Sequence, residues 1–215
     1  MTPSDPLPPL PPGLRSAAEA LLAGGGRRIL GLVGAPGAGK STLAQALAEA
    51  LAPHAQVVPM DGFHLAQAEL ARLGRAHRKG APDTFDAGGY AALLARLRAQ
   101  RPGDAAVYAP AFRRDLEEPI AGAIAVEAAV PLVIAEGNYL LLDDGPWAGV
   151  AAQLDAAWYV EAAPGLRLER LLQRHMRFGR SEAQARDWIA ATDEPNARRI
   201  EATRGRAQRI VRWDG

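Results

Sequence analysis

The sequence of 215 residues contains no cysteine, which excludes a disulfide framework, a thiolate metal site and a cysteine nucleophile. The spacing of its four histidines is not that of metal ligands, which argues against a structural zinc site. The longest apolar run, 128–135, is much shorter than the roughly 20 residues that a membrane-spanning helix needs. The proline-rich start has neither the basic nor the apolar region of a secretory signal. We therefore expect a cytoplasmic protein without a membrane partner.

An excess of charge of either sign is also lacking, since 25 basic residues face 24 acidic ones. The overall field of the protein thus gives no reason to expect a nucleic-acid partner. The arginines concentrate at 167–180 and 198–212, where they could bind phosphate, although a codon preference for arginine would explain them equally well. The proline-rich composition of residues 1–12 predicts a flexible lead-in, and the length of the chain predicts one domain at 13–215. The oligomeric state stays open, with a homodimer among the alternatives.

Apolar runs of strand length alternate with segments of helical periodicity along the chain. The sequence predicts strands at 28–33, 56–60, 131–135 and 156–160. It predicts helices at 14–23, 41–51, 87–100, 165–178, 181–191 and 194–206. This alternation is typical of an α/β fold of three α/β/α layers, in which helices cover both faces of a central parallel sheet.

A glycine-rich loop lies between the first predicted strand and the helix after it, and it fits the P-loop pattern G-x-x-x-x-G-K-[ST]. The backbone N–H groups of such a loop and the positive end of the following helix favour a polyphosphate. We expect Lys40 to reach the β- and γ-phosphates of ATP and Ser41 to bind Mg²⁺. The expected nucleotide-binding residues are Gly34, Ala35, Pro36, Gly37, Ala38, Gly39, Lys40, Ser41 and Thr42. The pattern alone does not separate kinases from ATPases, GTPases and switches.

Two acidic residues end predicted strands, at the sheet edge where ligands bind in open α/β folds. Asp61 follows the second strand, and its carboxylate could accept the proton of an attacking hydroxyl. The alternative is a cap for the next turn or helix. Glu136 ends the third strand, where it could hold the metal, or it could be a buried acceptor for a neighbouring loop.

Several segments together resemble the uridine kinase, type I pantothenate kinase and phosphoribulokinase group, and most closely its bacterial sugar-kinase-like members. The resemblance spans about residues 28–210. The segments that carry it are Gly34 to Ser41, Met60-Asp61-Gly62-Phe63-His64, Arg78 to Asp86, Tyr108-Ala109-Pro110 and Glu136 to Leu141. It implies a P-loop kinase with a helical lid that carries arginines.

The resemblance also implies roles for individual residues. Asp61 would be the base, and Glu136 would support both metal and acceptor. The remaining residues expected to border the acceptor are His64, Arg78, Lys79, Asp83, Asp86 and Tyr108. Arg113 and Arg114 follow Tyr108-Ala-Pro-Ala-Phe112, where the named kinases carry other residues, and they suit either an anionic acceptor or solvent.

Arginines recur along the segment 167–177 at i, i+3, i+7 and i+10, which places them on one side of a helix. This pattern is typical of an amphipathic surface helix, and it equally fits a lid that closes over the triphosphate. The resemblance favours Arg170, Arg174 and Arg180 as phosphate contacts, and we expect Arg174 to be catalytic. Asn196 opens the last helix and either contacts the acceptor or caps the helix.

Three function classes fit these observations. The first is a kinase that transfers the γ-phosphoryl group of ATP-Mg²⁺ to an alcohol of a small metabolite such as a sugar, a nucleoside or a pantothenate-like compound. The second is a nucleotide-hydrolysing switch or metallochaperone-type NTPase that acts on a protein partner, and the third is a binding module without catalysis. The absence of a guanine-reading Asn-Lys-x-Asp motif and the presence of Lys40, Ser41, Asp61 and Glu136 favour the kinase.

Overall fold

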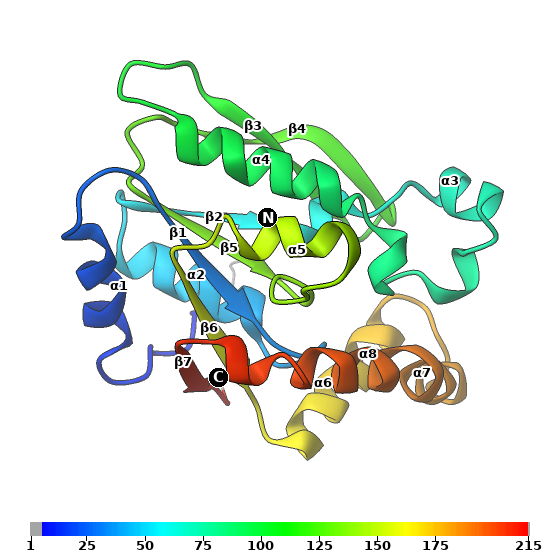
Figure 1. Cartoon of the computed structure of the whole chain (residues 1–215). Coiled ribbons are helices and arrows are strands. Elements are labelled where there is room, and N and C mark those ends of the chain that lie inside the picture. The colour runs from blue at the N-terminus through cyan, green and yellow to red at the C-terminus, as the bar shows by residue number, and fades with distance from the viewer. Residues whose placement is uncertain (1–5, 215) are drawn as a thin grey trace.

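A five-stranded parallel sheet in the order β2-β5-β1-β6-β7 forms the centre of the computed structural model, which describes residues 6–214 (Figure 1). Its strands are β1 (Arg28–Val33), β2 (Ala55–Pro59), β5 (Leu132–Gly137), β6 (Ala156–Glu161) and β7 (Arg209–Arg212). The first four confirm predicted strands to within a few residues. β7 was not predicted, because a strand of four residues with arginine at both ends carries too little apolar pattern.

Helices cover both faces of the sheet, which confirms the three-layer α/β/α prediction. One face carries α1 (Leu14–Leu22) and α2 (Lys40–Ala50), and the other carries α4 (Ala87–Ala99), α5 (Ala148–Ala151) and part of α8 (Glu194–Glu201). Consecutive residues of β1 explain the two layers, since Ile29 packs into the α4 side and Leu30 into the α1 and α2 side. Strands buried on both faces read as continuous apolar runs, as β1 and β5 do.

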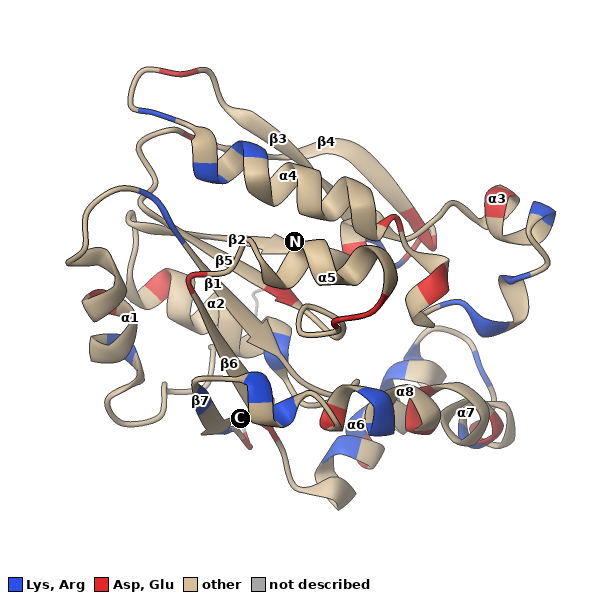
Figure 2. Cartoon of the chain, in the orientation of Figure 1, with Lys and Arg blue, Asp and Glu red and all other residues tan. Residues whose placement is uncertain are grey.

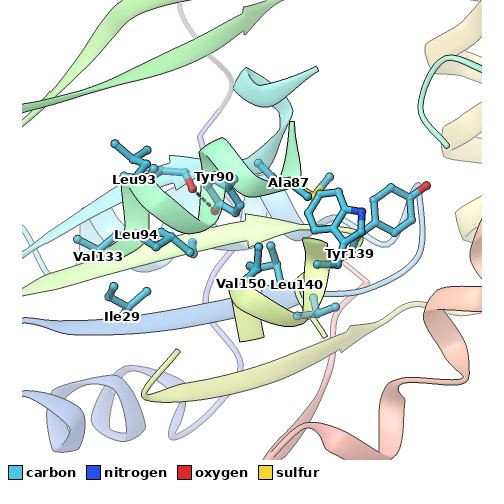
Figure 3. Close-up of a cluster of buried hydrophobic side chains, with 14 of the residues drawn as sticks. Ile29, Ala87, Tyr90, Leu93, Leu94, Val133, Tyr139, Leu140 and Val150 are labelled. Carbon is cyan, nitrogen blue, oxygen red and sulfur yellow. Dashed lines mark hydrogen bonds between the residues drawn. The ribbon is translucent and has the colours of Figure 1, made fainter. Parts of the chain in front are cut away.

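The core on the α4 side is rich in aromatic and leucine side chains (Figure 3). Tyr90 is fully buried there, and its hydroxyl donates a hydrogen bond to the Val58 carbonyl oxygen at 3.0 Å. Tyr139 and Trp147 lie beside Phe85 with ring centroids 5.7 and 5.8 Å from it. The Trp147 indole donates to the Pro82 carbonyl oxygen at 3.1 Å. These contacts fix the loop that leads into α4 against the core.

An antiparallel hairpin, β3 (Val107–Arg113) and β4 (Glu118–Val126), was not predicted from the sequence. β4 is rich in alanine and contains a glycine, so its strand propensity is low. β3 contains Pro110, where the pairing register shifts between Ala109 and Ala111. The turn also lacks the usual glycine signal, because Glu117 adopts the left-handed conformation with φ of 55°.

The segment beyond β6 is helical but more broken than expected. It contains α6 (Pro164–Arg177), α7 (Glu182–Trp188), a π-helical turn (Ile189–Asp193) and α8, which ends at Glu201. The predicted helix at 194–206 is therefore wrong beyond residue 201, where a short 3₁₀ turn at Arg204–Arg206 follows. A shorter helix, α3 (Gln67–Arg72), precedes the loop into α4. Within residues 6–214, no helix combines the length and the apolarity needed to cross a membrane.

Candidate active site

The phosphate loop wraps around the start of α2 at the carboxyl edge of β1. Gly37 and Gly39 have φ of 82° and 84°, a conformation that other residues rarely adopt, so glycine is needed at both positions. Lys40 is buried, and its Nζ donates to the Ala35 carbonyl oxygen at 3.1 Å. Burial lowers the Lys40 pKa to about 8, although the nearby carboxylates of Glu136 and Asp61 oppose this shift. An anion bound here would place a negative charge next to the Lys40 ammonium and would offset the cost of its burial.

Glu136 stands at the end of β5, the strand between β1 and β2. Its Oε1 accepts a hydrogen bond from the Ser41 hydroxyl at 3.1 Å. Burial, together with the charge of Asp61, raises the Glu136 pKa to about 7. A hydroxyl and a carboxylate at this distance are both oxygen ligands of the kind that Mg²⁺ prefers.

Asp61 lies in the 3₁₀ turn Met60–Phe63 directly after β2. Pairing of Pro59 with Glu136 in the sheet brings the two carboxylates to the same edge. The Asp61 Oδ2 accepts a hydrogen bond from Arg114 Nη2 at 3.1 Å, and the Asp61 side chain remains 29% exposed. Its neighbour Gly62 allows a close approach of the hairpin, since a Cβ there would lie 2.2 Å from the Pro110 carbonyl oxygen. The carboxylate is thus open to the edge of the sheet and not locked into the interior.

A cavity of about 830 Å³ lies over this edge, between the sheet, the β3–β4 hairpin and the α6–α8 segment. It brings together ten of the side chains that the sequence predicts for the site. They are Pro36, Lys40, Ser41, Asp61, His64, Lys79, Glu136, Arg174, Arg180 and Asn196. Residues that are more than a hundred positions apart in the chain therefore meet in one space.

Outside the phosphate loop and Thr42, five other predicted residues lie away from the lining of this cavity. Arg78 and Asp83 pair with each other at 2.5 Å, and Asp86 caps α4 by accepting from Gly89 N at 2.8 Å. Tyr108 is 59% exposed on the hairpin. Arg170 lies behind the phosphate loop, where a Cβ on Gly39 would be 3.3 Å from one of its nitrogens. To contact the acceptor or the phosphates, these residues would have to leave the positions described above. Their roles therefore stay predictions.

A second cavity of about 530 Å³ lies on the other side of the phosphate loop. Ala35 and Ala38 of the loop line it together with the end of β6 and the start of α6. The first turn of α6 is fixed to the loop, because Arg167 Nη1 donates to the Pro36 carbonyl oxygen at 3.3 Å. A Cβ on Gly37 would lie 2.6 Å from the Arg167 carbonyl oxygen. The two cavities thus flank one loop.

Sequence reasoning missed the residues that the hairpin turn and the last helices bring to the first cavity. The hairpin contributes Asp115, Leu116 and Glu117 from its turn and Glu118 from the start of β4. Because the hairpin itself was not predicted, the position of these charges could not be inferred. The one sequence signal for these residues was the density of charged residues that directly follow Arg113 and Arg114.

In the α6–α8 segment, His175 links two other lining residues. Its Nε2 lies 2.7 Å from Asp193 Oδ2, and Arg180 Nη1 lies 2.8 Å from its Nδ1. Arg180 also stacks on the Trp188 ring, with 3.9 Å between its Cζ and the ring centroid. The sequence gave no reason to expect a role for His175 in the site, because it is one polar residue among many in an arginine-rich helix.

The chain is similar in sequence to several known proteins. Escherichia coli protein YggC is 36% identical over 190 residues, covering 86% of this chain and 77% of its own. A Schizosaccharomyces pombe protein named "putative uridine kinase" is 34% identical over 162 residues, covering 71% of this chain and 68% of its own. Proteins named pantothenate kinase also match. No family model matches the chain.

A crystal structure of a protein from Silicibacter sp. TM1040, named "putative fructose transport system kinase", superposes with a TM-score of 0.82. It is 38% identical and aligned over 92% of this chain and 98% of its own. The chain belongs to this family of P-loop kinases. Members of this P-loop kinase family are small-molecule kinases, and the chain is one of them, an enzyme that transfers phosphate from ATP to a small metabolite.

Proposed function

We propose that this kinase transfers the γ-phosphoryl group of ATP-Mg²⁺ to a hydroxyl group of its acceptor, with Asp61 as the general base. The observation that carries the proposal is the shared cavity, in which Asp61 and the phosphate-loop residues Lys40 and Ser41 line one space. A terminal phosphate held by the loop would lie between Lys40 and Asp61. The acceptor hydroxyl would approach from the side of the hairpin.

Ser41 and Glu136 fit a magnesium site, although such a site would be completed by other oxygens. Residues 6–214 contain no cluster of three or more His, Cys, Asp or Glu side chains that could hold a metal by themselves. Mg²⁺ in kinases is commonly bound by one or two protein oxygens together with phosphates and water. A metal bound there would supply charge neutralisation between the phosphates. The pair Ser41 and Glu136, 3.1 Å apart, is what this chain offers.

Arg174 and Arg180 support a phosphate-binding role for the α6–α8 segment. Both line the cavity across from the phosphate loop. Burial lowers the pKa of Arg174, which is consistent with a guanidinium that an anionic ligand would stabilise. We assign these two residues to the γ-phosphate side, and we place the nucleoside part of ATP in the second cavity, beyond Ala35 and Ala38.

Asp61 has the position of a base, and Arg114 holds its carboxylate in place. The deprotonation step moves the proton of the acceptor hydroxyl to this carboxylate as the oxygen attacks phosphorus. We expect Asp61→Asn to bind ATP normally and to lower kcat by about 10²–10⁴, the usual contribution of a general base. The measurement is ADP release with sugars, nucleosides, pantothenate and vitamin alcohols as acceptors.

Asp115→Asn is the matched control, because Asp115 also lines the cavity but pairs with Arg113 at 2.7 Å. This control should keep most of its activity. Near-normal phosphorylation by Asp61→Asn would contradict the base assignment. Hydrolysis that no acceptor changes, but that a protein partner accelerates, would favour the nucleotide-driven switch instead.

A further inference from the structure

Three side chains of the α6–α8 segment form a hydrogen-bonded chain at the wall of the first cavity. His175 lies in the middle, with its Nε2 2.7 Å from Asp193 Oδ2 and its Nδ1 2.8 Å from Arg180 Nη1. The side chains of His175 and Asp193 are only 13% and 10% exposed. Figure 2 shows that basic and acidic residues both occur along this segment. All three members of the chain line the cavity that contains the phosphate-loop lysine.

The chemistry of the three groups assigns the direction of both hydrogen bonds. A guanidinium only donates, so Nδ1 of His175 accepts from Arg180. An ionised carboxylate only accepts, so Nε2 of His175 carries a proton and donates to Asp193. The neutral imidazole with its proton on Nε2 satisfies both partners. Because both ring nitrogens are engaged, an effect of His175 on a ligand has to pass through Arg180.

Arg180 is held from two directions in this arrangement. Its guanidinium stacks on the Trp188 ring at 3.9 Å, and its Nη1 donates to His175. Burial lowers the pKa of Arg180, and the charges of Asp193 and Glu117 oppose this shift. The bond to His175 uses one of the five guanidinium N–H donors, and the stacking uses none. The orientation of the planar fork is thus set while other donors can face phosphate oxygens.

Asp193 anchors this arrangement to the π-helical turn. It is the last residue of that turn, Ile189–Asp193, and it is buried. A buried carboxylate is costly unless it is hydrogen-bonded, and His175 supplies a donor. Single π-helical turns are rare and occur frequently at functional sites. The turn thereby links the second half of the segment to the end of α6.

We infer that His175 is a positioning residue, which Asp193 holds in place and which directs the Arg180 guanidinium toward the γ-phosphate of ATP. This inference rests on the proposed phosphate contact of Arg180 and explains how that contact is oriented. A residue that holds an arginine by one edge reduces the freedom that the arginine would otherwise lose on binding the phosphate. His175 thus acts on phosphate binding without touching the nucleotide.

Nucleotide binding tests the inference without an acceptor. Calorimetry measures Kd for ADP-Mg²⁺ and for the Mg²⁺ complex of an ATP analogue that cannot transfer its γ-phosphate. The ratio of the first Kd to the second, here called the γ-preference, reports contacts to the γ-phosphate. A substitution that only loosens the fold weakens both nucleotides alike and leaves the ratio unchanged. We expect His175→Gln to lower the γ-preference by about tenfold, because a hydrogen bond to a charged group is lost.

Two substitutions of His175 separate its two hydrogen bonds. His175→Gln places an amide N–H near the position of Nε2, so it can donate to Asp193 but does not accept from Arg180. His175→Asn places an amide oxygen near the position of Nδ1, so it can accept from Arg180 but does not reach Asp193. We therefore expect His175→Asn to keep most of the γ-preference and to be less stable in urea, and His175→Gln to show the reverse. A γ-preference in His175→Asn no larger than that in His175→Gln would overturn the inference.

A double variant shows whether His175 acts through Arg180. If it does, His175→Gln should lower the γ-preference no further in a protein that already carries Arg180→Ala. An additional loss in the double variant would contradict the inference. His54→Gln is the matched control, because His54 is exposed after α2 and lies outside the cavity lining. It should leave the γ-preference unchanged.

Arg180→Ala alone separates this inference from the proposed function. A lower γ-preference in Arg180→Ala supports the phosphate contact, and an unchanged value in His175→Gln would then refute the positioning role alone. An unchanged value in Arg180→Ala would refute both the phosphate contact and the inference. The assignment of Asp61 as the base is decided independently by the activity of Asp61→Asn.

Discussion

Glu136 is a buried carboxyl at the edge of the sheet, close to Asp61 and Lys40. Its pKa is raised from 4.5 to about 7, chiefly by burial and then by Asp61. The folded protein therefore holds this proton more tightly than the unfolded chain does. Such a group favours folding at low pH, and the benefit is lost as the pH rises from about 4.5 through about 7.

Replacing Glu136 with glutamine removes this pH dependence, because the amide cannot ionise. We expect the free energy of unfolding of Glu136→Gln, relative to the unsubstituted protein, to increase as the pH rises from about 4.5 to about 7. Urea unfolding at several pH values, without metal or nucleotide, measures it. Glu49→Gln, on the exposed side of α2, is the control. Parallel stability profiles for Glu136→Gln and the unsubstituted protein would contradict a buried carboxyl of raised pKa.

At the residue scale, sequence reasoning placed Lys40, Ser41, Asp61 and Glu136 because each follows or precedes a strand end at a fixed offset. Parallel strands bring such positions to one edge, so their meeting was predictable. The pair of Arg114 and Asp61 was not, because it depends on how a hairpin folds over the edge. Arg78 and Asp83 illustrate the same limit, since two charges within one loop pair with each other.

At the scale of elements, the β3–β4 hairpin and the end of α6 face one cavity from different sides. Leu116 at the hairpin turn and Phe178 after α6 both line it, yet they are 56% and 46% exposed. Large apolar side chains at an open rim would become buried if the two elements approached each other around bound ligands. A kinase gains from such closure, because it keeps water from taking the phosphoryl group.

We expect Leu116→Ser and Phe178→Ser to weaken this exclusion of water. In both variants, the ratio of ADP release without acceptor to that with acceptor should rise by about threefold or more. Ile120→Ser is the control, because Ile120 is a large apolar residue that is 39% exposed on β4 and does not line the cavity. Equal ratios in all three variants would argue against closure through these elements.

The elements that were not predicted from the sequence were missed for a common physical reason. Local pattern predicts strands in the buried sheet, where both faces are apolar, but β3 and β4 are held by each other and by the turn at Met60–Phe63. The π-helical turn at Ile189–Asp193 likewise has no local sequence signal, and it directs Thr192 and Asp193 to the cavity. Such features depend on contacts between distant segments.

At the scale of the whole molecule, ATP should stabilise the fold through the phosphate loop, which joins α2 to the centre of the sheet. A ligand at 100 times its Kd adds about 2.7 kcal/mol to the stability of the folded state. For a chain of this length, that corresponds to a rise in Tm of roughly 5–10 °C. We expect Lys40→Ala to lose most of this rise, as thermal unfolding with and without ATP would show.

Lys79→Ala is the matched control, since Lys79 is the other lysine of the sequence and lines the acceptor side of the same cavity. It should keep the rise in Tm. Full protection by ATP in Lys40→Ala would refute nucleotide binding at the phosphate loop.

The packing of α6 on the phosphate loop limits which part of the α6–α8 segment can move. Gly37 touches the Arg167 backbone and the Leu171 side chain so closely that a Cβ would lie within 2.6 and 2.9 Å of them. The first two turns of α6 are thereby anchored, and a swing of the segment must begin after Leu171. Arg174, His175 and Arg180 all lie beyond that pivot. Phosphates that bind in the loop would therefore contact a fixed first part of α6, whereas the cationic side chains beyond Leu171 could adjust their positions.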